Sequence, residues 1–501
     1  MLRFASQSTC LLWSNSVLFL ALPSRVVTAH SAKSKNVAPS AGYIWVRIVY
    51  VIRGIWRRKT GRDGPFVTLH MAQHPAILQK DNESSGPALS LAQLVRDNVP
   101  ALGPNSKFHG VWWLPGGDAQ TAYSSFGDFS KVDPVVYERL FLELSDKGVV
   151  AIDVTPPLSS HPIQNAENVL LVTHGLTGGS HEAYVRAVLA KVTPSRQSGD
   201  LGFRAVVLNF RGCNGSPVVT PRLYHAGSSD DLRHVVLWIS TSFPSCRMYG
   251  LGFSLGANIL AKYVGEEGEQ CPLLGFVTLA NPWDFLEGSH HLPSTFLGRH
   301  IYRYVLGGAL RALLRLHQGV FLKASKLPVS RSVLDDVLRR RSITLRQYDE
   351  LITAPMYGFA NPYDYYSKIS SCKVAPDIRI PCLSINSIDD PITGTRSLPI
   401  SQVSHSPYLV LAVTETGGHL GWFEHTQDGR IGRWYVKPVE QYLAALLDYG
   451  LQDRQKPSVI RLGTDFVHQE GRDDVGFRVL SREQSELIVS GTEESRLFTG
   501  W

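Results

Sequence analysis

Cysteine pairs are missing from this sequence of 501 residues. Six cysteines are spread along the chain without a CxxC motif or any paired spacing: Cys10, Cys213, Cys246, Cys271, Cys372 and Cys382. This spacing argues against a disulfide-stapled secreted domain. It favours reduced thiols, in the core or on the surface of an intracellular protein. The sequence also contains no internal repeat.

Acidic residues are absent from the first 62 residues, where ten lysines and arginines occur. The net charge of +7 and the pI of about 9.0 therefore describe the N-terminal segment more than the rest of the chain. The basic residues show no motif that reads nucleic acid, so we do not expect a nucleic-acid partner. An anionic membrane surface fits this segment better.

A long, uninterrupted apolar run is also lacking, so the sequence contains no secure transmembrane helix. Residues 11–22 fit either a signal peptide, with a cleavage site near residues 27–29, or an acid-free organelle presequence. Residues 43–56 contain Arg47 and Arg53, which are costly in hydrocarbon, and so favour a helix lying in a membrane interface. We expect a membrane-associated intracellular protein, with a leader of no function as the simpler alternative.

The composition is that of a globular protein, with 44% hydrophobic and 19% charged residues. Near-continuous apolar strands alternate with helices, which predicts a mostly parallel sheet covered by helices on both faces. The expected strands are 108–114, 148–154, 168–173, 203–210, 247–253, 274–280, 380–386 and 408–414, and the expected helices are 89–95, 180–192, 230–239, 255–264 and 439–447. Residues 115–121 are expected to form a turn.

The alternation stops after residue 284 and resumes near residue 380. The stretch between is basic and helical, with helices expected over 299–316 and 333–341, and it is too long for a simple loop. We therefore predict a helical cap over the carboxyl edge of the sheet. The expected parts are a leader (1–62), an N-terminal extension packed on the outside (63–107), the first part of the core (108–283), the cap (284–375), the second part of the core (376–450) and a loosely held polar tail (451–501).

The stretch Gly252-Phe-Ser-Leu-Gly256 joins an expected strand to an expected helix. Gly-x-Ser-x-Gly in that position predicts a sharp turn that exposes the hydroxyl of Ser254 beside helix N-terminal N–H groups. Alone, the pentapeptide fits an ordinary turn equally well. A reactive serine also needs a base, a carboxylate that orients the base, and donors for an oxyanion.

Candidates for the base and the carboxylate follow Ser254 in the chain order found in α/β-hydrolases. Asp389 and Asp390 follow the strand expected over 380–386. His419 follows the strand expected over 408–414 and has glycines on both sides. Glycines on both sides let the backbone bend, so that the His419 ring can reach the serine. We favour Asp390 as the carboxylate because it directly precedes a proline and an apolar residue, which leaves Asp389 as a neighbour that holds the turn.

Oxyanion donors are expected from two backbone N–H groups. Leu255 directly follows Ser254, and the loop His174-Gly-Leu-Thr-Gly-Gly-Ser180 follows the strand expected over 168–173. Within this loop Leu176 is the favoured second donor. We interpret His174 as a histidine that braces the loop, and not as a base.

Several longer motifs accompany these residues: Gly117-Asp118-Ala-Gln-Thr121, the His174 to Ser180 loop, Asn209-Phe-Arg-Gly-Cys-Asn-Gly-Ser-Pro217, Tyr224-His-Ala-Gly-Ser-Ser-Asp-Asp-Leu232, Asp389-Asp-Pro391 and Gly417-Gly-His-Leu-Gly421. With them, residues 112–449 resemble the YheT-like α/β-hydrolases, which include fungal medium-chain fatty-acid ethyl ester synthase/esterases. The resemblance implies an α/β-hydrolase fold, Ser254 as nucleophile, Asp390 as orienting acid and His419 as base. It implies no metal or organic cofactor. Residues 285–345 do not align by motif, which leaves acyl length and acceptor open.

His225 and Asp230 match an H-x4-D spacing that occurs in lipid acyltransferases. Both lie in a segment before an expected helix, where Asp230 or Asp231 can act near the helix start. We favour a structural role for the pair.

The sequence thus predicts a serine esterase that acts on acyl esters, of medium-chain lipid type, through an acyl-enzyme. One alternative is an acyl-CoA:alcohol O-acyltransferase, in which an alcohol instead of water resolves the acyl-enzyme. An alternative of another class is a non-catalytic lipid-binding protein with the same fold. The expected partner is a small-molecule acyl ester or acyl-CoA.

Overall fold

The computed structural model describes residues 66–81, 87–193, 200–461 and 465–490. The predicted leader of residues 1–62, with its two apolar stretches and Cys10, lies outside the described residues. None of the helices within the described ranges is long and apolar enough to cross a membrane. The five cysteines in these ranges are buried and form no disulfide with one another.

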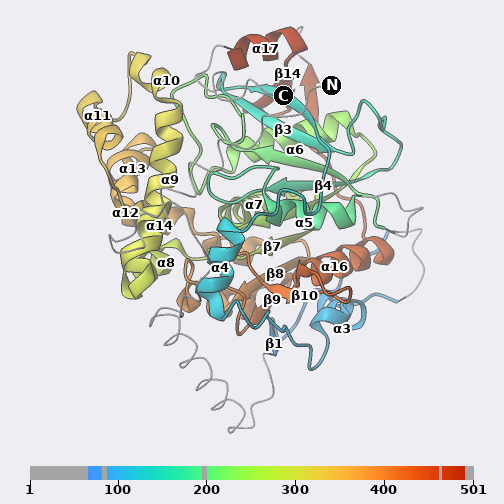
Figure 1. The fold of residues 1–501 in the computed structure, drawn as a ribbon. Helices are drawn as coiled ribbons and strands as arrows, with labels where there is room; N and C mark the ends of the chain where they lie inside the picture. The colour runs from blue at the N-terminus through green and yellow to red at the C-terminus, as the bar shows by residue number, and fades with distance from the viewer. Residues whose placement is uncertain (1–65, 82–86, 194–199, 462–464, 491–501) are drawn as a thin grey trace, which may run out of the picture. The chain divides into compact units, whose positions relative to one another are not determined.

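A 12-stranded sheet forms the centre of the described residues (Figure 1). Its middle is a block of parallel strands in the order β9-β8-β7-β6-β4-β5. Their bounds are β9 (Leu409–Thr414), β8 (Cys382–Ser387), β7 (Leu273–Leu279), β6 (Arg247–Phe253), β4 (Asn168–Thr173) and β5 (Arg204–Asn209). Nearly all their residues are buried, because helices cover both faces of the sheet. The predicted α/β class is confirmed.

Antiparallel strands extend both edges of this parallel block. Beyond β5 lie β3 (Val149–Thr155), β2 (Glu138–Leu144), β14 (Arg472–Val479), β13 (Val467–Gln469) and β12 (Val459–Arg461). At the other edge β1 (Val67–Met71) pairs with β9. The extension predicted to pack on the outside therefore contributes a strand to the sheet.

The segment predicted as a loosely held tail also contributes to the sheet. β14 pairs with β2, Val475 and Phe477 are buried, and helix α17 (Arg482–Ser490) follows. The prediction is therefore wrong for the strands at residues 459–461, 467–469 and 472–479. Polar residues surround the few apolar positions of β14, so the local pattern resembles a loop, and pairing with a strand more than 300 residues away decides the structure.

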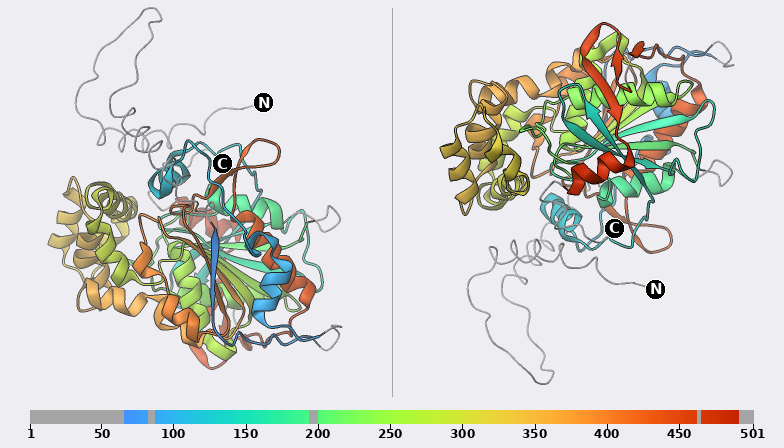
Figure 2. Two further views of the ribbon diagram at one scale, coloured as in Figure 1. Left: turned by 90° about the horizontal axis from the view of Figure 1, so that it is seen from below. Right: turned by 90° about the horizontal axis from the view of Figure 1, so that it is seen from above.

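Helices cover both faces of the sheet (Figure 2). On one face the buried side chains of α3 (Leu91–Asn98), α5 (Ala183–Val192) and α16 (Val436–Tyr449) share one core with the sheet. On the other face α6 (Asp230–Ser242) and α7 (Leu255–Glu267) share the second core. Each of these five helices overlaps a predicted one.

The segment of residues 108–126 differs from its prediction. Residues 108–114 form no strand, and Phe108 is buried against Trp434, with ring centroids 5.7 Å apart. The turn expected over 115–121 lies in helix α4 (Gly116–Phe126). Two glycines at its start disfavour a helix by about 1 kcal/mol each, so the helix depends on tertiary contacts.

Between β7 and β8 the described chain contains helices and no strand. They are α8 (Phe285–His291), α9 (Arg303–Leu316), α10 (Gln318–Lys323), α11 (Arg331–Arg339), α12 (Leu345–Tyr348), α13 (Ala354–Met356) and α14 (Pro362–Ile369), in yellow and orange in Figure 1. π-helical turns at Gly298–Tyr302 and Asp349–Thr353 adjoin α9 and α12. We call this helical segment the cap. Helix α15 (Ile400–His405) joins β8 to β9.

Candidate active site

Ser254 lies at the sharp turn between β6 and α7. Its φ of 50° is in the left-handed region, which non-glycine residues adopt at a cost. A Cβ on Gly256 would lie 2.3 Å from the His174 carbonyl oxygen, and one on Gly252 would lie 2.5 Å from the Ala257 Cα. Both glycines of the Gly-x-Ser-x-Gly pattern are therefore required by close backbone packing around the serine.

The His419 ring connects Ser254 to Asp390. Ser254 Oγ and His419 Nε2 are 2.6 Å apart, and His419 Nδ1 lies 2.8 Å from Asp390 Oδ2. With the Nδ1 proton donated to the carboxylate, Nε2 can accept the proton of the serine hydroxyl. The three side chains that chain order suggested thus form one hydrogen-bonded row, although they come from three separate loops after β6, β8 and β9.

Asp390, and not Asp389, contacts His419. Burial of Asp390 opposes its ionisation, but His419 and two backbone N–H groups of the following turn hold its pKa below the ordinary value. Asp390 is therefore a carboxylate that can stabilise a positive imidazole. Asp389 instead accepts the Gly418 N–H at 3.0 Å, and burial raises the pKa of Asp389 to about 6.

Helix α4 holds the loop that contains His419. Thr121 Oγ1 accepts the His419 N–H at 2.8 Å and donates its own proton to the Gly117 carbonyl at 2.7 Å. A Cβ on Gly117 would lie 1.8 Å from the Asp389 carbonyl oxygen, so α4 packs directly on the aspartate loop. Thr121 and Gly117 are missing from the site predicted from the sequence, which placed them in a turn. The signal for them was the Gly117 to Thr121 motif of the family resemblance.

Leu176 and Leu255 line the same cavity as Ser254. Leu255 is the first residue of α7, and Leu176 lies in the loop after β4. Within the described part of the chain, neither backbone N–H has a hydrogen-bond acceptor. Both groups are therefore available to a negatively charged oxygen beside the serine.

His174 is fully buried beneath this loop. Its Nδ1 lies 2.7 Å from the Gly175 carbonyl oxygen, and its Nε2 accepts the Phe210 N–H at 3.2 Å. Burial lowers the pKa of His174 to about 4, so the ring is neutral near pH 7. These contacts give it the bracing position that the sequence suggested.

A cavity of about 260 Å³ extends from Ser254 and His419 into the cap. Its lining is largely apolar and comes from α8, α9, α10 and the segment 344–357, with side chains such as Phe285, Leu306, Leu310, Leu314, Phe321 and Ile352. A largely apolar cavity with a serine hydroxyl in its lining suits a ligand that has an apolar chain and a polar group.

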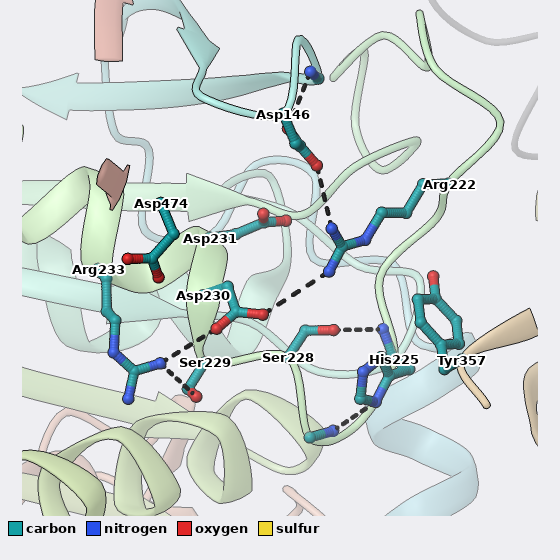
Figure 3. A network of polar contacts seen from close by, with 12 residues as sticks. Asp146, Arg222, His225, Ser228, Ser229, Asp230, Asp231, Arg233, Tyr357 and Asp474 are labelled. Atoms are coloured by element: carbon teal, nitrogen blue, oxygen red, sulfur yellow. Dashed lines mark hydrogen bonds and ion pairs between the residues drawn. The ribbon is translucent and has the colours of Figure 1, made fainter. Parts of the chain in front are cut away.

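His225 and Asp230 do not meet (Figure 3). His225 is half-buried, its ring centroid lies 4.3 Å from that of Tyr357, and its Nδ1 accepts the Gly227 N–H. Asp230 is exposed in the first turn of α6 and pairs with Arg233 at 3.3 Å and Arg222 at 3.7 Å. The H-x4-D spacing thus brings together no acid–base pair, and each residue makes structural contacts.

Comparison with known proteins finds one matching family model and several relatives. Residues 168–324 match a family model described as the alpha/beta hydrolase fold. A monoacylglycerol lipase of Saccharomyces cerevisiae is 32% identical over 407 residues, which cover 74% of this chain and 87% of the relative. Medium-chain fatty acid ethyl ester synthase/esterase 2 of the same yeast is 28% identical, covering 72% and 90% of the two chains. Phospholipase ABHD3 of Homo sapiens is 27% identical, covering 72% and 84%. This chain therefore belongs to the α/β-hydrolase family.

Proposed function

We propose that this protein is a serine hydrolase that cleaves carboxylic esters of lipid acyl groups. The main support is the hydrogen-bonded row of Ser254, His419 and Asp390, of which Ser254 and His419 line a largely apolar cavity. A serine with such neighbours is activated as a nucleophile, and the cavity offers room for an acyl chain. The names of the relatives, a lipase, an ester synthase/esterase and a phospholipase, support the same class.

In the proposed reaction each group has a defined part. His419 Nε2 takes the Ser254 proton as the serine oxygen attacks the ester carbonyl, and Asp390 stabilises the resulting imidazolium. The N–H groups of Leu176 and Leu255 donate to the carbonyl oxygen as it becomes negative. His419 then gives its proton to the departing alcohol, which leaves an acyl group on Ser254. Water, deprotonated by the same histidine, releases the acid and restores the serine.

The cavity supports a preference for acyl chains of medium length. Each buried CH₂ contributes about 0.8 kcal/mol, so catalytic efficiency should rise with chain length until the chain fills the 260 Å³ cavity. Beyond that length it should fall, because the chain must displace cap side chains. A panel of p-nitrophenyl esters of increasing acyl length measures this profile. Efficiency that does not depend on length would contradict binding in this cavity.

A fluorophosphonate probe tests the nucleophile directly. The wild-type protein should be labelled covalently, and Ser254→Ala should lose both labelling and ester hydrolysis. Thr393→Ser, a mild change in another residue of the cavity lining, is the control for folding and should be labelled. Failure of the wild-type protein to react would instead favour a non-catalytic lipid-binding protein.

The acceptor for the acyl group is a second, separate question. One relative is named for both synthesis and hydrolysis of ethyl esters, which favours alcohol as an alternative acceptor to water. Incubation with a medium-chain acyl-CoA and ethanol distinguishes the two outcomes by product analysis. Formation of free acid alone would refute the transferase reaction and leave the hydrolase intact.

A further inference from the structure

Basic residues are concentrated in the cap. Residues 285–369 contain twelve lysines and arginines against six acidic residues, whereas residues 63–284 and 370–501 together contain 28 against 37. Within the cap, residues 288–304 and 337–348 include six arginines and no acidic residue. A positive cap thus sits on a core that is net negative, and it can attract an anionic partner.

Exposed aromatic rings lie beside several of these arginines. Phe296 is 75% exposed, and Tyr304 and Tyr363 are 36% and 38% exposed. The Arg303 guanidinium lies 4.9 Å from the centroid of the Tyr304 ring, and that of Arg346 lies 4.5 Å from the Tyr363 ring. We define the cap rim as Phe296, Arg299, Arg303, Tyr304, Arg346 and Tyr363.

The cap rim adjoins the wall of the active-site cavity. Arg303 and Arg346 line this cavity, as does the segment just before Phe296. Tyr302 donates a hydrogen bond of 2.8 Å to Asp118 of α4, which connects this part of the cap to the helix that holds the histidine loop. A surface bound at the cap rim would therefore lie beside the cavity that Ser254 lines.

We propose that the cap rim docks on an anionic lipid bilayer. Arginines can pair with lipid phosphates while their stems pack along apolar surface, and aromatic rings favour the boundary between headgroups and acyl chains. A lysine or arginine near an anionic bilayer contributes about fivefold in affinity. The docking is independent of the leader of residues 1–62. Its purpose, delivery of bilayer esters to the cavity, rests on the proposed hydrolase function.

A polarity-sensitive fluorophore at the rim tests the docking without any reference to activity. The label is placed on Phe296→Cys in a full-length Cys10→Ser background, since the other cysteines are buried. A matched label replaces Leu487 of α17, which is 71% exposed. Mixed phosphatidylcholine–phosphatidylserine vesicles should shift the emission at position 296 to the blue and leave position 487 unchanged. No shift at 296, or equal shifts at both positions, would overturn the proposal.

Substitutions that spare the cavity then test what the docking does. Phe296→Ser and Arg299→Glu lie outside the cavity lining, so turnover of a short water-soluble ester should stay unchanged. Hydrolysis of an ester embedded in phosphatidylserine-containing vesicles should fall roughly fivefold or more for each change. Leu487→Ser and Arg482→Glu on α17 are the matched controls and should change neither rate. Equal losses on both substrates would show that the rim acts only on structure.

Discussion

Asp389 and Asp390 are adjacent residues in different chemical environments. Asp390 faces His419 and keeps its charge, because the imidazole and two backbone N–H groups offset its burial. Asp389 has one oxygen on the Gly418 N–H, and its other oxygen is buried without a hydrogen-bond partner among the described residues. Asp390 can therefore stabilise a positive charge on the His419 imidazole, while Asp389 holds the loop that contains Gly418.

The two carboxylates should respond differently to the same substitution. Asp390→Asn should lower kcat/KM for ester hydrolysis by about 10⁴-fold, because the imidazolium loses its counter-charge and the ring loses its tautomer. Asp389→Asn keeps an oxygen for the Gly418 N–H and should lose less than about tenfold. Steady-state kinetics of both variants on one ester measures the difference. Equal losses of kcat/KM in the two variants would mean that the conformation of the aspartate loop affects hydrolysis more than the charge of Asp390 does.

Asp389 should also give stability a pH dependence. Its pKa is raised to about 6 from 3.8, so above pH 6 the native state contains an unfavourable buried charge that the unfolded state does not. Below about pH 4 the carboxyl is protonated in both states and the cost disappears. Above pH 6, Asp389→Asn should therefore increase the free energy of unfolding by about 1–3 kcal/mol and raise the melting temperature. Near pH 4 the substitution should have little effect on either quantity. Thermal unfolding of both proteins across this range tests it, and an effect independent of pH would contradict it.

At the scale of elements, α4 is a helix that contacts the loops of both His419 and Asp389. It begins with two glycines, packs against the Asp389 carbonyl, and supplies the acceptor for the His419 N–H. A single hydroxyl, that of Thr121, thus connects a helix early in the chain to a loop 298 residues later.

Two glycine-to-alanine substitutions distinguish the effect of close packing by α4 from the general effect of glycine on helix stability. Gly117→Ala should reduce both stability and kcat, because its Cβ would lie 1.8 Å from the Asp389 oxygen and must displace α4 or the loop. Gly308→Ala, in the middle of α9 with nothing within 4 Å of the added Cβ, should stabilise the protein by about 0.5–1 kcal/mol. Urea unfolding and kinetics on both variants measure the contrast. Retention of full activity by the first variant would refute the proposed role of α4.

Strand β14 is the second element with a testable contribution. Phe477 is 4% exposed and pairs with Leu144 of β2. Phe477→Ala should lower the free energy of unfolding by about 3–5 kcal/mol, whereas Val479→Ala, at an exposed position of the same strand, should change it little. Denaturant unfolding compares the two. Equal, small effects would show that the C-terminal edge is not part of the cooperative core.

At the scale of the whole molecule, positive charge is concentrated in two separate places, the leader and the cap. We propose that the protein is intracellular and that the leader attaches it to membranes, since the leader combines ten basic residues with two apolar stretches. Deletion of residues 1–62 should move the protein from the membrane pellet to the soluble fraction after cell fractionation. The Arg299→Glu variant with an intact leader is the control and should stay in the pellet. Unchanged recovery of the deleted protein with membranes would refute attachment by the leader.

The sequence by itself determined the strands of the parallel block, Ser254 at its turn and the order of Ser254, Asp390 and His419. These depend on local patterns: unbroken apolar runs for buried strands, and glycines where the backbone must pack closely. Tertiary structure decided what depends on residues far apart in the chain. It selected Asp390 as the contact of His419, made a helix of α4 despite its glycines, and turned a polar tail into the sheet edge β14. For α4 and β14 a contact across hundreds of residues outweighs a weak local preference. For Asp390 the deciding contact is with His419, which follows 29 residues later in the chain.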